Sequence, residues 1–332
     1  MFQDLAALLE CPACHGRLDW EVKARRGERI EEGEARCGAC HAAYPVREGI
    51  ALFLTPDLPR NDLWEGVDSR LAQYLREHPQ VEHQLLETPL EALSPADQFY
   101  RAAVLEERGH YEQARAALGM AEAGIYSAEY RACHQSQIQH LLGHLSDVSG
   151  PIVDLASGRC GLVEVLAQQL PRPIVATDFS PRVLRRDRRW LEAFGLHERV
   201  SLLCFDARRT PFRDGAIATM TTNLGLPNIE QPAGLLQELR RIISGELLAV
   251  TFFYAEDDPA NAAVIRQSGL DPLLFRRPAL ELFAAAGFQV ELQNVQVGRA
   301  LPTPQSALLE GAGIDALPVA ETTLEWCLLA AH

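Results

Sequence analysis

The chain lacks the segments that would place it in or across a membrane. No run of apolar residues approaches the roughly 18–20 that a helix needs to span a bilayer. Residues 1–10 carry two acidic residues and no basic one, so they lack the basic region and the long apolar stretch of a secretory signal. We therefore expect a cytoplasmic protein with no membrane partner.

Positive charge is scarce, and Lys23 is the only lysine. The 45 acidic residues outnumber the 31 basic ones, and the net charge is -14. The overall field of such a protein does not attract nucleic acid, although a local basic patch could still exist. Nucleic acid is therefore a disfavoured partner rather than an excluded one. The length of 332 residues allows two domains, and the 47% content of hydrophobic residues is ordinary for a soluble globular protein.

Four of the eight cysteines form two close pairs, Cys11 with Cys14 and Cys37 with Cys40. Two Cys-x2-Cys turns separated by 22 residues are typical of a tetrahedral zinc site with four thiolate ligands. Four protein ligands leave no open position, so the zinc would be structural rather than catalytic. A module of about 50 residues is too small to rely on its core alone, and the metal would supply much of its folding free energy.

A histidine follows each cysteine pair and leaves alternatives open. His15 and His41 complete the Cys-x-x-Cys-His pattern of covalent haem attachment. That reaction normally requires an exported chain, which residues 1–10 do not indicate. Either histidine could also replace a cysteine as a metal ligand. The simplest interpretation is that both are exposed turn residues.

The apolar pattern divides the chain into three regions. Residues 1–54 hold the cysteine module, and residues 55–150 show short amphipathic periods broken by prolines, which predicts a helical linker or cap. Residues 151–332 alternate short apolar runs with helical stretches, which predicts a doubly wound, Rossmann-like α/β sheet. The predicted strands are 152–156, 174–178, 200–205, 216–222, 247–253, 288–297 and 324–330, and the predicted helices are 97–118, 127–145, 162–169, 181–194, 232–243 and 278–286. No helix separates the last two strands, so we expect seven strands with an antiparallel strand at one edge.

Acidic residues end three successive predicted strands. Asp154 ends the first and precedes a turn of small residues, Ala156-Ser157-Gly158, that opens a helix. Small residues let a cofactor approach the backbone closely, and free amides at a helix start suit a carboxylate. Asp178 ends the second strand 24 positions later, a spacing that suits a carboxylate bound to both hydroxyls of a ribose. NAD sites share this acid, so it does not choose the cofactor by itself.

The order of these motifs resembles that of class I S-adenosylmethionine-dependent methyltransferases. Asp206 and Ala207 follow the third strand, and Asn223 and Leu224 end the fourth, where members of this family contact the cofactor and its acceptor. The resemblance implies S-adenosylmethionine as the cofactor. It implies that these residues bind it: Asp154, Ala156, Ser157, Gly158, Asp178, Phe179, Asp206, Ala207, Asn223 and Leu224. The chain departs from the family pattern at Ala156 and Cys160, where the family has glycine.

The cysteine module resembles a second family. It is similar to the small zinc ribbon of the tRNA-methyltransferase activator family in the segments Cys11-Pro-Ala-Cys14-His-Gly-Arg-Leu, Cys37-Gly-Ala-Cys40 and Tyr44-Pro-Val-Arg-Glu-Gly-Ile. Ribbons of this family partner or precede class I methyltransferases. A similar ribbon begins the bacterial rRNA guanine-N1 methyltransferases, where it helps to hold RNA.

The methyl acceptor and the oligomeric state are not identified by these motifs. We expect a small-molecule acceptor, because the middle region is acidic and the fourth strand lacks the Asn-Pro-Pro-aromatic signature that grips a planar amine. An RNA methyltransferase of the guanine-N1 kind, with the ribbon as an RNA clamp, is the main alternative. A non-catalytic cofactor-binding or activator protein is the other.

Three side chains ahead of the first strand are the candidates for contact with the reacting groups. Tyr126, Tyr130 and His134 follow a four-residue spacing that would put them on one face of a helix. A helix face that merely packs on the sheet explains the same pattern.

Overall fold

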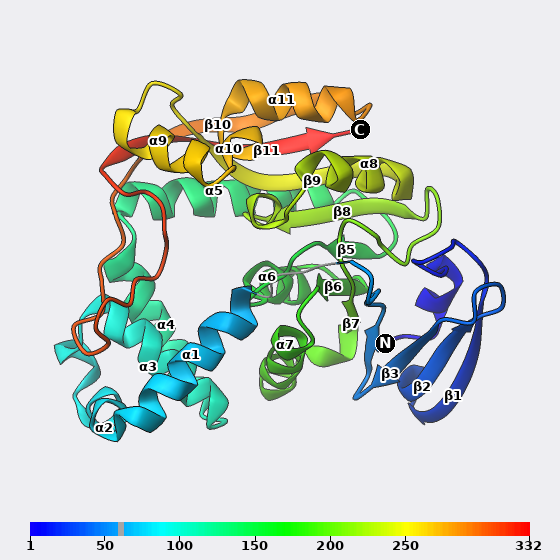
Figure 1. Cartoon of the computed structure of the whole chain (residues 1–332), viewed down its shortest axis with the longest axis horizontal. Helices are drawn as coiled ribbons and strands as arrows, with labels where there is room; N and C mark the ends of the chain where they lie inside the picture. Colours follow the sequence, from blue (N-terminus) through cyan, green and yellow to red (C-terminus); the bar gives the residue numbers. More distant parts are fainter. Residues whose placement is uncertain (59–62) are drawn as a thin grey trace.

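The computed structural model of the chain describes residues 1–58 and 63–332, with residues 63–69 described by their backbone alone. In these residues a single sheet of 11 strands runs through the molecule, in the order β1-β2-β3-β4-β7-β6-β5-β8-β9-β11-β10 (Figure 1). The strands are β1 (Leu18–Arg26), β2 (Arg29–Cys37), β3 (Ala43–Arg47), β4 (Ile50–Leu52), β5 (Ile152–Asp154), β6 (Ile174–Asp178), β7 (Val200–Cys204), β8 (Ile217–Asn223), β9 (Ile243–Tyr254), β10 (Val290–Ala300) and β11 (Thr322–Ala331).

The seven strands after residue 150 form the Rossmann-like sheet that the sequence predicts. They are parallel except for β11, which runs antiparallel to both of its neighbours, β9 and β10. The antiparallel strand is therefore one place in from the edge, because β10 pairs on its outer side. Successive side chains of the buried strands enter two different hydrophobic cores, so that Ile152 packs on one face of the sheet and Val153 on the other.

Helices cover both faces of this half. They are α6 (Gly161–Gln169), α7 (Pro181–Ala193), α8 (Pro232–Ile242), α9 (Pro259–Gln267), α10 (Asp271–Leu274) and α11 (Arg276–Ala285). The predictions for α6, α7, α8 and α11 are confirmed to within two residues at each end. The sequence did not predict α9 and α10, which fill the connection between β9 and α11.

The cysteine module continues the same sheet. β1 to β4 form an antiparallel meander that follows a short 3-10 helix, Asp4–Leu8. β4 then pairs in parallel with β7, so that Ile50 lies beside Leu202, and the amide of Phe53 donates to the carbonyl of Cys204 at 2.7 Å. The expected seven strands are thereby joined to four more. Since one hydrophobic core includes residues of the module and of the later strands, the division at residue 54 stays a proposal.

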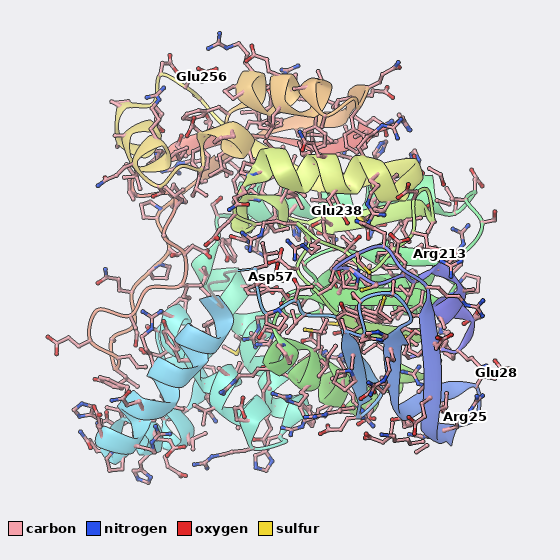
Figure 2. The ribbon with its side chains drawn as sticks, turned by 45° about the vertical axis from the view of Figure 1, so that its right-hand side comes forward. Arg25, Glu28, Asp57, Arg213, Glu238 and Glu256 are labelled. Atoms are coloured by element: carbon pink, nitrogen blue, oxygen red, sulfur yellow. The ribbon has the colours of Figure 1, made fainter. Side chains whose placement is uncertain are left out.

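A second set of contacts fixes the module against residues 211–213, which lie between β7 and β8. The amide of Glu10 donates to the carbonyl of Pro211 at 2.7 Å, and the amide of Arg213 donates to the carbonyl of Leu8 at 3.0 Å. The Arg213 guanidinium, labelled in Figure 2, also donates to the carbonyl of Leu9 at 3.2 Å. The module is therefore held both by its last strand and by the segment that precedes its first cysteine.

The region after residue 54 is helical, as predicted, and its first four helices lie at the left of Figure 1, whereas the cysteine module lies at the right. Its helices are α1 (Leu63–Glu77), α2 (Pro79–Glu87), α3 (Pro95–Glu107), α4 (Tyr111–Ile125) and α5 (Ala128–Leu145). The helix expected over 97–118 is two helices, because the chain turns at Gly109, which has a φ of 78°. Ser94 and Ser127 cap α3 and α5 by accepting from the amides of Asp97 and Tyr130. None of the described helices is long and apolar enough to cross a membrane.

A long connection, which we call the strap (residues 301–321), runs from β10 to the helical region and back to β11 (Figure 1). Its attachment point is Asp97 on α3, which is 1% exposed. The carboxylate of Asp97 accepts hydrogen bonds from the Ser306 hydroxyl and, at 3.2 Å each, from the amides of Ala307 and Leu308. A buried anion thus ties the strap to the helical region.

Candidate cofactor site and zinc centre

The four paired cysteines converge at one end of the sheet. The sulfurs of Cys11, Cys14, Cys37 and Cys40 all lie within 4.8 Å of one another. The Cys11–Cys40 sulfur distance is 3.6 Å and the Cys14–Cys37 distance is 3.4 Å. Zinc–sulfur bonds of about 2.3 Å place the sulfurs of a regular tetrahedron about 3.8 Å apart, so the cluster has the dimensions of a four-thiolate zinc centre.

Local backbone geometry builds this centre. The amides of Ala39 and Cys40 both point at the Cys37 sulfur at 3.4 Å, and these hydrogen bonds lower the pKa of that thiol to about 6. A Cβ atom on Gly16 would lie 2.9 Å from the Cys37 sulfur and 3.2 Å from that of Cys14, so only glycine leaves room for the cluster. The fold therefore favours the thiolate form at Cys37, whereas burial raises the pKa of Cys11.

The two histidines of the module stay outside the cluster. His15 and His41 occupy left-handed backbone positions, with φ of 58° and 62°, directly after each turn. The His15 ring bonds the carboxylate of Glu10 at 2.6 Å. Both are exposed turn residues, as the simplest interpretation held.

A cavity of about 790 Å³ lies at the carboxyl ends of β5, β6 and β7. Of the ten predicted cofactor residues, these five line it: Ala156, Asp178, Phe179, Asp206 and Ala207. The opposite wall is formed by residues 227–232, by Ser268, Gly269 and Leu270 from the α9–α10 connection, and by Pro272 and Leu273 of α10. Three successive strand ends thus meet at one cavity, as the sequence spacing predicts.

The turn after β5 is shaped for close approach although its first position is not glycine. Ala156 adopts a left-handed conformation with a φ of 53°, and Gly158 does the same at 55°. The amide of Ser157 donates to the carbonyl of Thr177 at 2.8 Å, which fastens the turn to β6. A Cβ on Gly225 would lie 3.0 Å from that of Ala156, so a small residue in the next loop makes room for the alanine.

Asp178 connects β6 to the turn. One carboxylate oxygen accepts from the amide of Gly158 at 3.2 Å, and the other accepts from the amide of Ser180 at 2.9 Å. The side chain is only 6% exposed and lines the cavity. An oriented carboxylate at this position can accept hydrogen bonds from neighbouring hydroxyl groups of a ligand.

Asp206 has a partner that the sequence analysis missed. The Arg208 guanidinium binds its carboxylate in a two-pronged pair, with Nε–Oδ1 at 2.9 Å and Nη2–Oδ2 at 2.7 Å. Both side chains are more than 90% buried, and both residues line the cavity. The Asp-x-Arg spacing was the signal for this pair, because residues two apart around a turn can face each other.

The remaining predicted residues lie beside the cavity rather than on its wall. Ser157 and Gly158 belong to the turn, and Leu224 follows β8 with a φ of 57°. The Asn223 side chain bonds His134 on α5, where Oδ1 lies 3.0 Å from Nε2 of the ring. Tyr126, Tyr130 and His134 are not among the described residues that line the cavity.

The expected helix face is only partly formed. Tyr126 ends α4 and precedes the Ser127 cap, so it is not in the helix that carries Tyr130 and His134. The Tyr126 and Tyr130 rings nevertheless stack, with centroids 4.6 Å apart and planes 10° from parallel. The prediction that these residues are neighbours holds, but the geometry comes from a chain turn instead of a continuous helix.

Asp154 lies beneath the turn and is 1% exposed. Burial raises the pKa of its carboxyl to about 7, against the opposing effect of hydrogen bonds from Ser157 and Thr221. The Thr221 hydroxyl donates to Oδ1 at 2.9 Å. This acid therefore carries a proton over a pH range in which an exposed aspartate is ionised.

We expect Asp154→Asn to stabilise the free protein in a pH-dependent way. Between pH about 4 and 7 the unfolded aspartate is ionised while the folded one keeps its proton, which costs wild type about 1.4 kcal/mol of unfolding free energy per pH unit. The asparagine keeps an oxygen acceptor for Thr221 and does not titrate, so its advantage should grow over that range and stay constant above it. Denaturant unfolding at several pH values measures the difference, with the exposed Asp19→Asn as control. An advantage independent of pH would contradict the assignment.

Comparison with known proteins adds two family matches. Residues 152–245 match the family described as Methyltransferase domain, and residues 3–49 match the family described as Trm112p-like protein. The UPF0434 protein of Shewanella sediminis (strain HAW-EB3) is 36% identical over 50 residues, which cover 15% of this chain and 70% of that protein.

Similarity in the second half is more distant. The ubiquinone/menaquinone biosynthesis C-methyltransferase UbiE of Geotalea uraniireducens (strain Rf4) is 28% identical over 103 residues, or 30% of this chain and 44% of that protein. The chain therefore spans less than half the length of this relative. Geranyl diphosphate C-methyltransferase from Streptomyces coelicolor A3(2) has 16% identity and a TM-score of 0.45, over 67% of this chain and 83% of that one.

The two family matches cover the two sites described above. The Trm112p-like match contains the four-thiolate centre, and the methyltransferase match contains the strand ends that line the cavity. The chain therefore belongs to the Trm112p-like family through its N-terminal zinc ribbon, which it carries in one polypeptide with a class I S-adenosylmethionine-dependent methyltransferase domain.

Proposed function

We propose that the protein transfers the methyl group of S-adenosylmethionine to a small-molecule acceptor. The observation that carries this proposal is the 790 Å³ cavity, which has fixed acids on one wall and a mainly apolar second wall. When bound, the cofactor supplies a methyl group that is already activated by its positive sulfur. The protein then has to bind, orient and exclude water, and a site of this shape suits those tasks.

The acidic wall fits the nucleoside part of the cofactor. We assign Asp178 to the ribose hydroxyls, and Asp206 with the backbone of Ala207 to the adenine. The Arg208 pair fixes the Asp206 carboxylate in one orientation, so this acid is positioned before the ligand arrives. We assign Ala156, Ser157 and Gly158 to the turn that faces the methionine part.

The second wall of the cavity is mainly apolar. Pro227, Ile229, Leu270, Pro272 and Leu273 contribute most of its apolar side chains. Apolar walls with a few convergent polar groups are typical of small-molecule sites. The relative UbiE is named as a C-methyltransferase of ubiquinone and menaquinone biosynthesis, which supports an acceptor of this general kind. We also propose a cytoplasmic location, because four thiolate ligands persist best in a reducing compartment.

Titration calorimetry with S-adenosylmethionine and its demethylated product tests the cofactor assignment. We expect Asp178→Ala to weaken binding by at least about 100-fold, because it removes charged hydrogen bonds that together contribute roughly 3 kcal/mol. The exposed Asp257→Ala is the matched control and should bind as wild type does. A wild-type protein that fails to bind at millimolar concentration would instead favour a non-catalytic activator.

The ribbon keeps an RNA acceptor as the second candidate. Proteins that hold RNA through phosphate contacts bind more weakly as salt rises. Salt-sensitive binding of a structured RNA at low ionic strength, lost on disruption of the ribbon, would replace the small-molecule proposal. Absence of RNA binding at low salt would remove this candidate.

A further inference from the structure

A group of aromatic side chains lies beyond the cavity, against the outer part of the sheet. We call it the aromatic cluster; its members are Tyr126, Tyr130, Phe252, Tyr254 and Trp326. The Tyr130 ring meets the Trp326 ring edge-on at 4.9 Å, and Phe252 contacts both Tyr254 and Trp326. The cluster therefore joins the start of α5 to the carboxyl half of β9.

The aromatic cluster is connected to the end of β8. The His134 ring lies 5.6 Å from that of Trp326, and its Nε2 bonds the side chain of Asn223 at 3.0 Å. Asn223 itself does not line the cavity, but Gly225, two residues further on, lies against Ala156 of the cavity wall. A line of contacts thus leads from the cavity to the aromatic cluster.

Two polar atoms of the aromatic cluster are buried without a partner. Tyr254 is 3% exposed and Trp326 is 0% exposed, yet the Tyr254 hydroxyl and the Trp326 Nε1 find no hydrogen bond within the described part of the chain. An unpaired buried donor costs roughly 1–3 kcal/mol. A fold retains such groups where a ligand supplies the missing acceptor, and these two observations point to a ligand at the cluster.

The strap brings one acid to the same place. The Tyr126 hydroxyl donates to Oδ2 of Asp315 at 2.8 Å, and the Asp315 backbone is held by the hydroxyl of Thr303 at 3.2 Å. Oδ1 has no hydrogen-bond partner among the described residues. The Asp315 side chain is accessible to solvent, but enough protein surrounds it for burial to raise the pKa of its carboxyl. The carboxylate is therefore open to solvent although protein forms much of its surroundings.

We propose that Asp315 is the proton acceptor for the methyl transfer, and that the acceptor substrate reacts through a hydroxyl oxygen or an acidic carbon on an aromatic or enolisable body. This inference rests on the proposed methyltransferase function. The flat aromatic walls suit a planar substrate, and the Tyr254 hydroxyl and Trp326 Nε1 are donors for its oxygen atoms.

The step balances without any further reactant. The proton of the substrate's O–H or C–H group moves to Oδ1 of Asp315, and the electron pair left on oxygen or carbon attacks the methyl carbon. The carbon–sulfur bond breaks, and its electron pair stays on sulfur, which becomes a neutral thioether. Asp315 then releases the proton to solvent.

Asp315 suits this role better than the nearby histidine. Burial lowers the pKa of His134, and the ring nitrogen Nε2 is already bonded to Asn223. The titratable groups that face Asp315 are Tyr126 from the end of α4, Tyr130 from α5 and Tyr254 from β9, and burial raises the pKa of all three phenols. They stay neutral, so among these groups Asp315 is the one that can act as a base.

The test compares wild type with Asp315→Asn, which keeps an oxygen acceptor for Tyr126. Methyl transfer from S-adenosylmethionine is measured on phenols, naphthols and 1,3-diketones, with alkylamines and thiols as the contrasting set. We expect wild type to methylate members of the first set. Asp315→Asn should lower kcat at least about 100-fold on acceptors that keep their proton, and less than about threefold on 4-nitrophenol at a pH where it is already ionised. The acid limb of the wild-type pH profile should disappear in the variant.

Control experiments distinguish failure of the Asp315 inference from failure of the proposed methyltransferase function. Glu310→Gln, an exposed change on the same strap, should leave rates unchanged, and Asp315→Asn should bind S-adenosylmethionine as wild type does. Equal losses on ionised and un-ionised acceptors, turnover of amines or thiols only, or no turnover by a wild type that binds the cofactor would each overturn the role of Asp315. Failure of wild type to bind S-adenosylmethionine would instead remove the proposed function.

Discussion

Protein carrying both Cys37→Ser and Cys40→Ser is expected to purify without zinc, to lose the fold of the ribbon and to bind S-adenosylmethionine at least about tenfold more weakly. Zinc contributes on the order of 10–16 kcal/mol to the folding of small four-ligand modules, which exceeds the total stability of many domains. Serine hydroxyls do not replace the two thiolates. The remaining core of the ribbon is too small to hold its four strands.

The effect on the cofactor follows from shared structure. Phe205, Ala207 and Phe212 belong to the same hydrophobic core as the ribbon residues Leu9 and Phe53. The segment between β7 and β8 therefore packs against the ribbon. That segment carries Asp206, the acid that we assign to adenine. Loss of the ribbon removes its support from one side.

Metal analysis, calorimetric melting and cofactor titration on the same samples measure the three effects. Cys133→Ala removes a buried thiol outside the cluster and should keep one zinc per chain. One zinc per chain in the double variant would show that the four cysteines are not the ligands. A zinc-free variant with unchanged cofactor affinity would show that the ribbon and the cavity are independent.

Asp97→Ala is expected to release the strap and to lower the free energy of unfolding by about 3–5 kcal/mol. The change leaves the Ser306 hydroxyl and the amides of Ala307 and Leu308 without their buried acceptor. Hydrogen bonds to an ionised group contribute roughly 1.5–3 kcal/mol each, and part of that loss is recovered when water reaches the freed donors.

Hydrogen exchange locates the effect of Asp97→Ala. Amides of residues 306–309 should lose their protection, while those of β5 and β6 should exchange as in wild type. The exposed Glu91→Ala, a few residues earlier, is the control for removal of a carboxylate in this region. Unchanged protection of 306–309 would mean that the strap is held by contacts other than Asp97.

The sequence predicted those parts of the fold that depend on local patterns. The alternation of apolar runs located all seven later strands, and the acids at their ends led to the cavity. The caps at Ser94 and Ser127 are also local, because each hydroxyl accepts from an amide only three residues away. The turn at Gly109 was not predicted, because a turn inside a helical pattern depends on how the two resulting helices pack.

What the sequence missed depends on contacts between distant segments. The pairing of β4 with β7 joins residues about 150 positions apart, and nothing in residues 50–52 specifies that partner. The second wall of the cavity was missed because α9 and α10 are short and have no clear apolar period. The surroundings of Asp315 could not be predicted from the sequence, because its neighbours Tyr126 and Tyr254 come from two other elements.

The continuous sheet also determines which strand edges are covered. All five residues of β7 are buried, and parallel strands of this kind expose a full row of backbone donors and acceptors when nothing lies beside them. β4 covers that row, and the rest of the ribbon makes β1 the edge strand at this end of the sheet. The last four residues of β1 are exposed, and its Lys23, Arg25 and Arg26 disfavour pairing with a strand of another chain. A methyltransferase domain separated from its ribbon would therefore present a self-complementary, apolar strand to its own copies. By stabilising the ribbon that covers β7, the zinc centre thus protects the chain against aggregation.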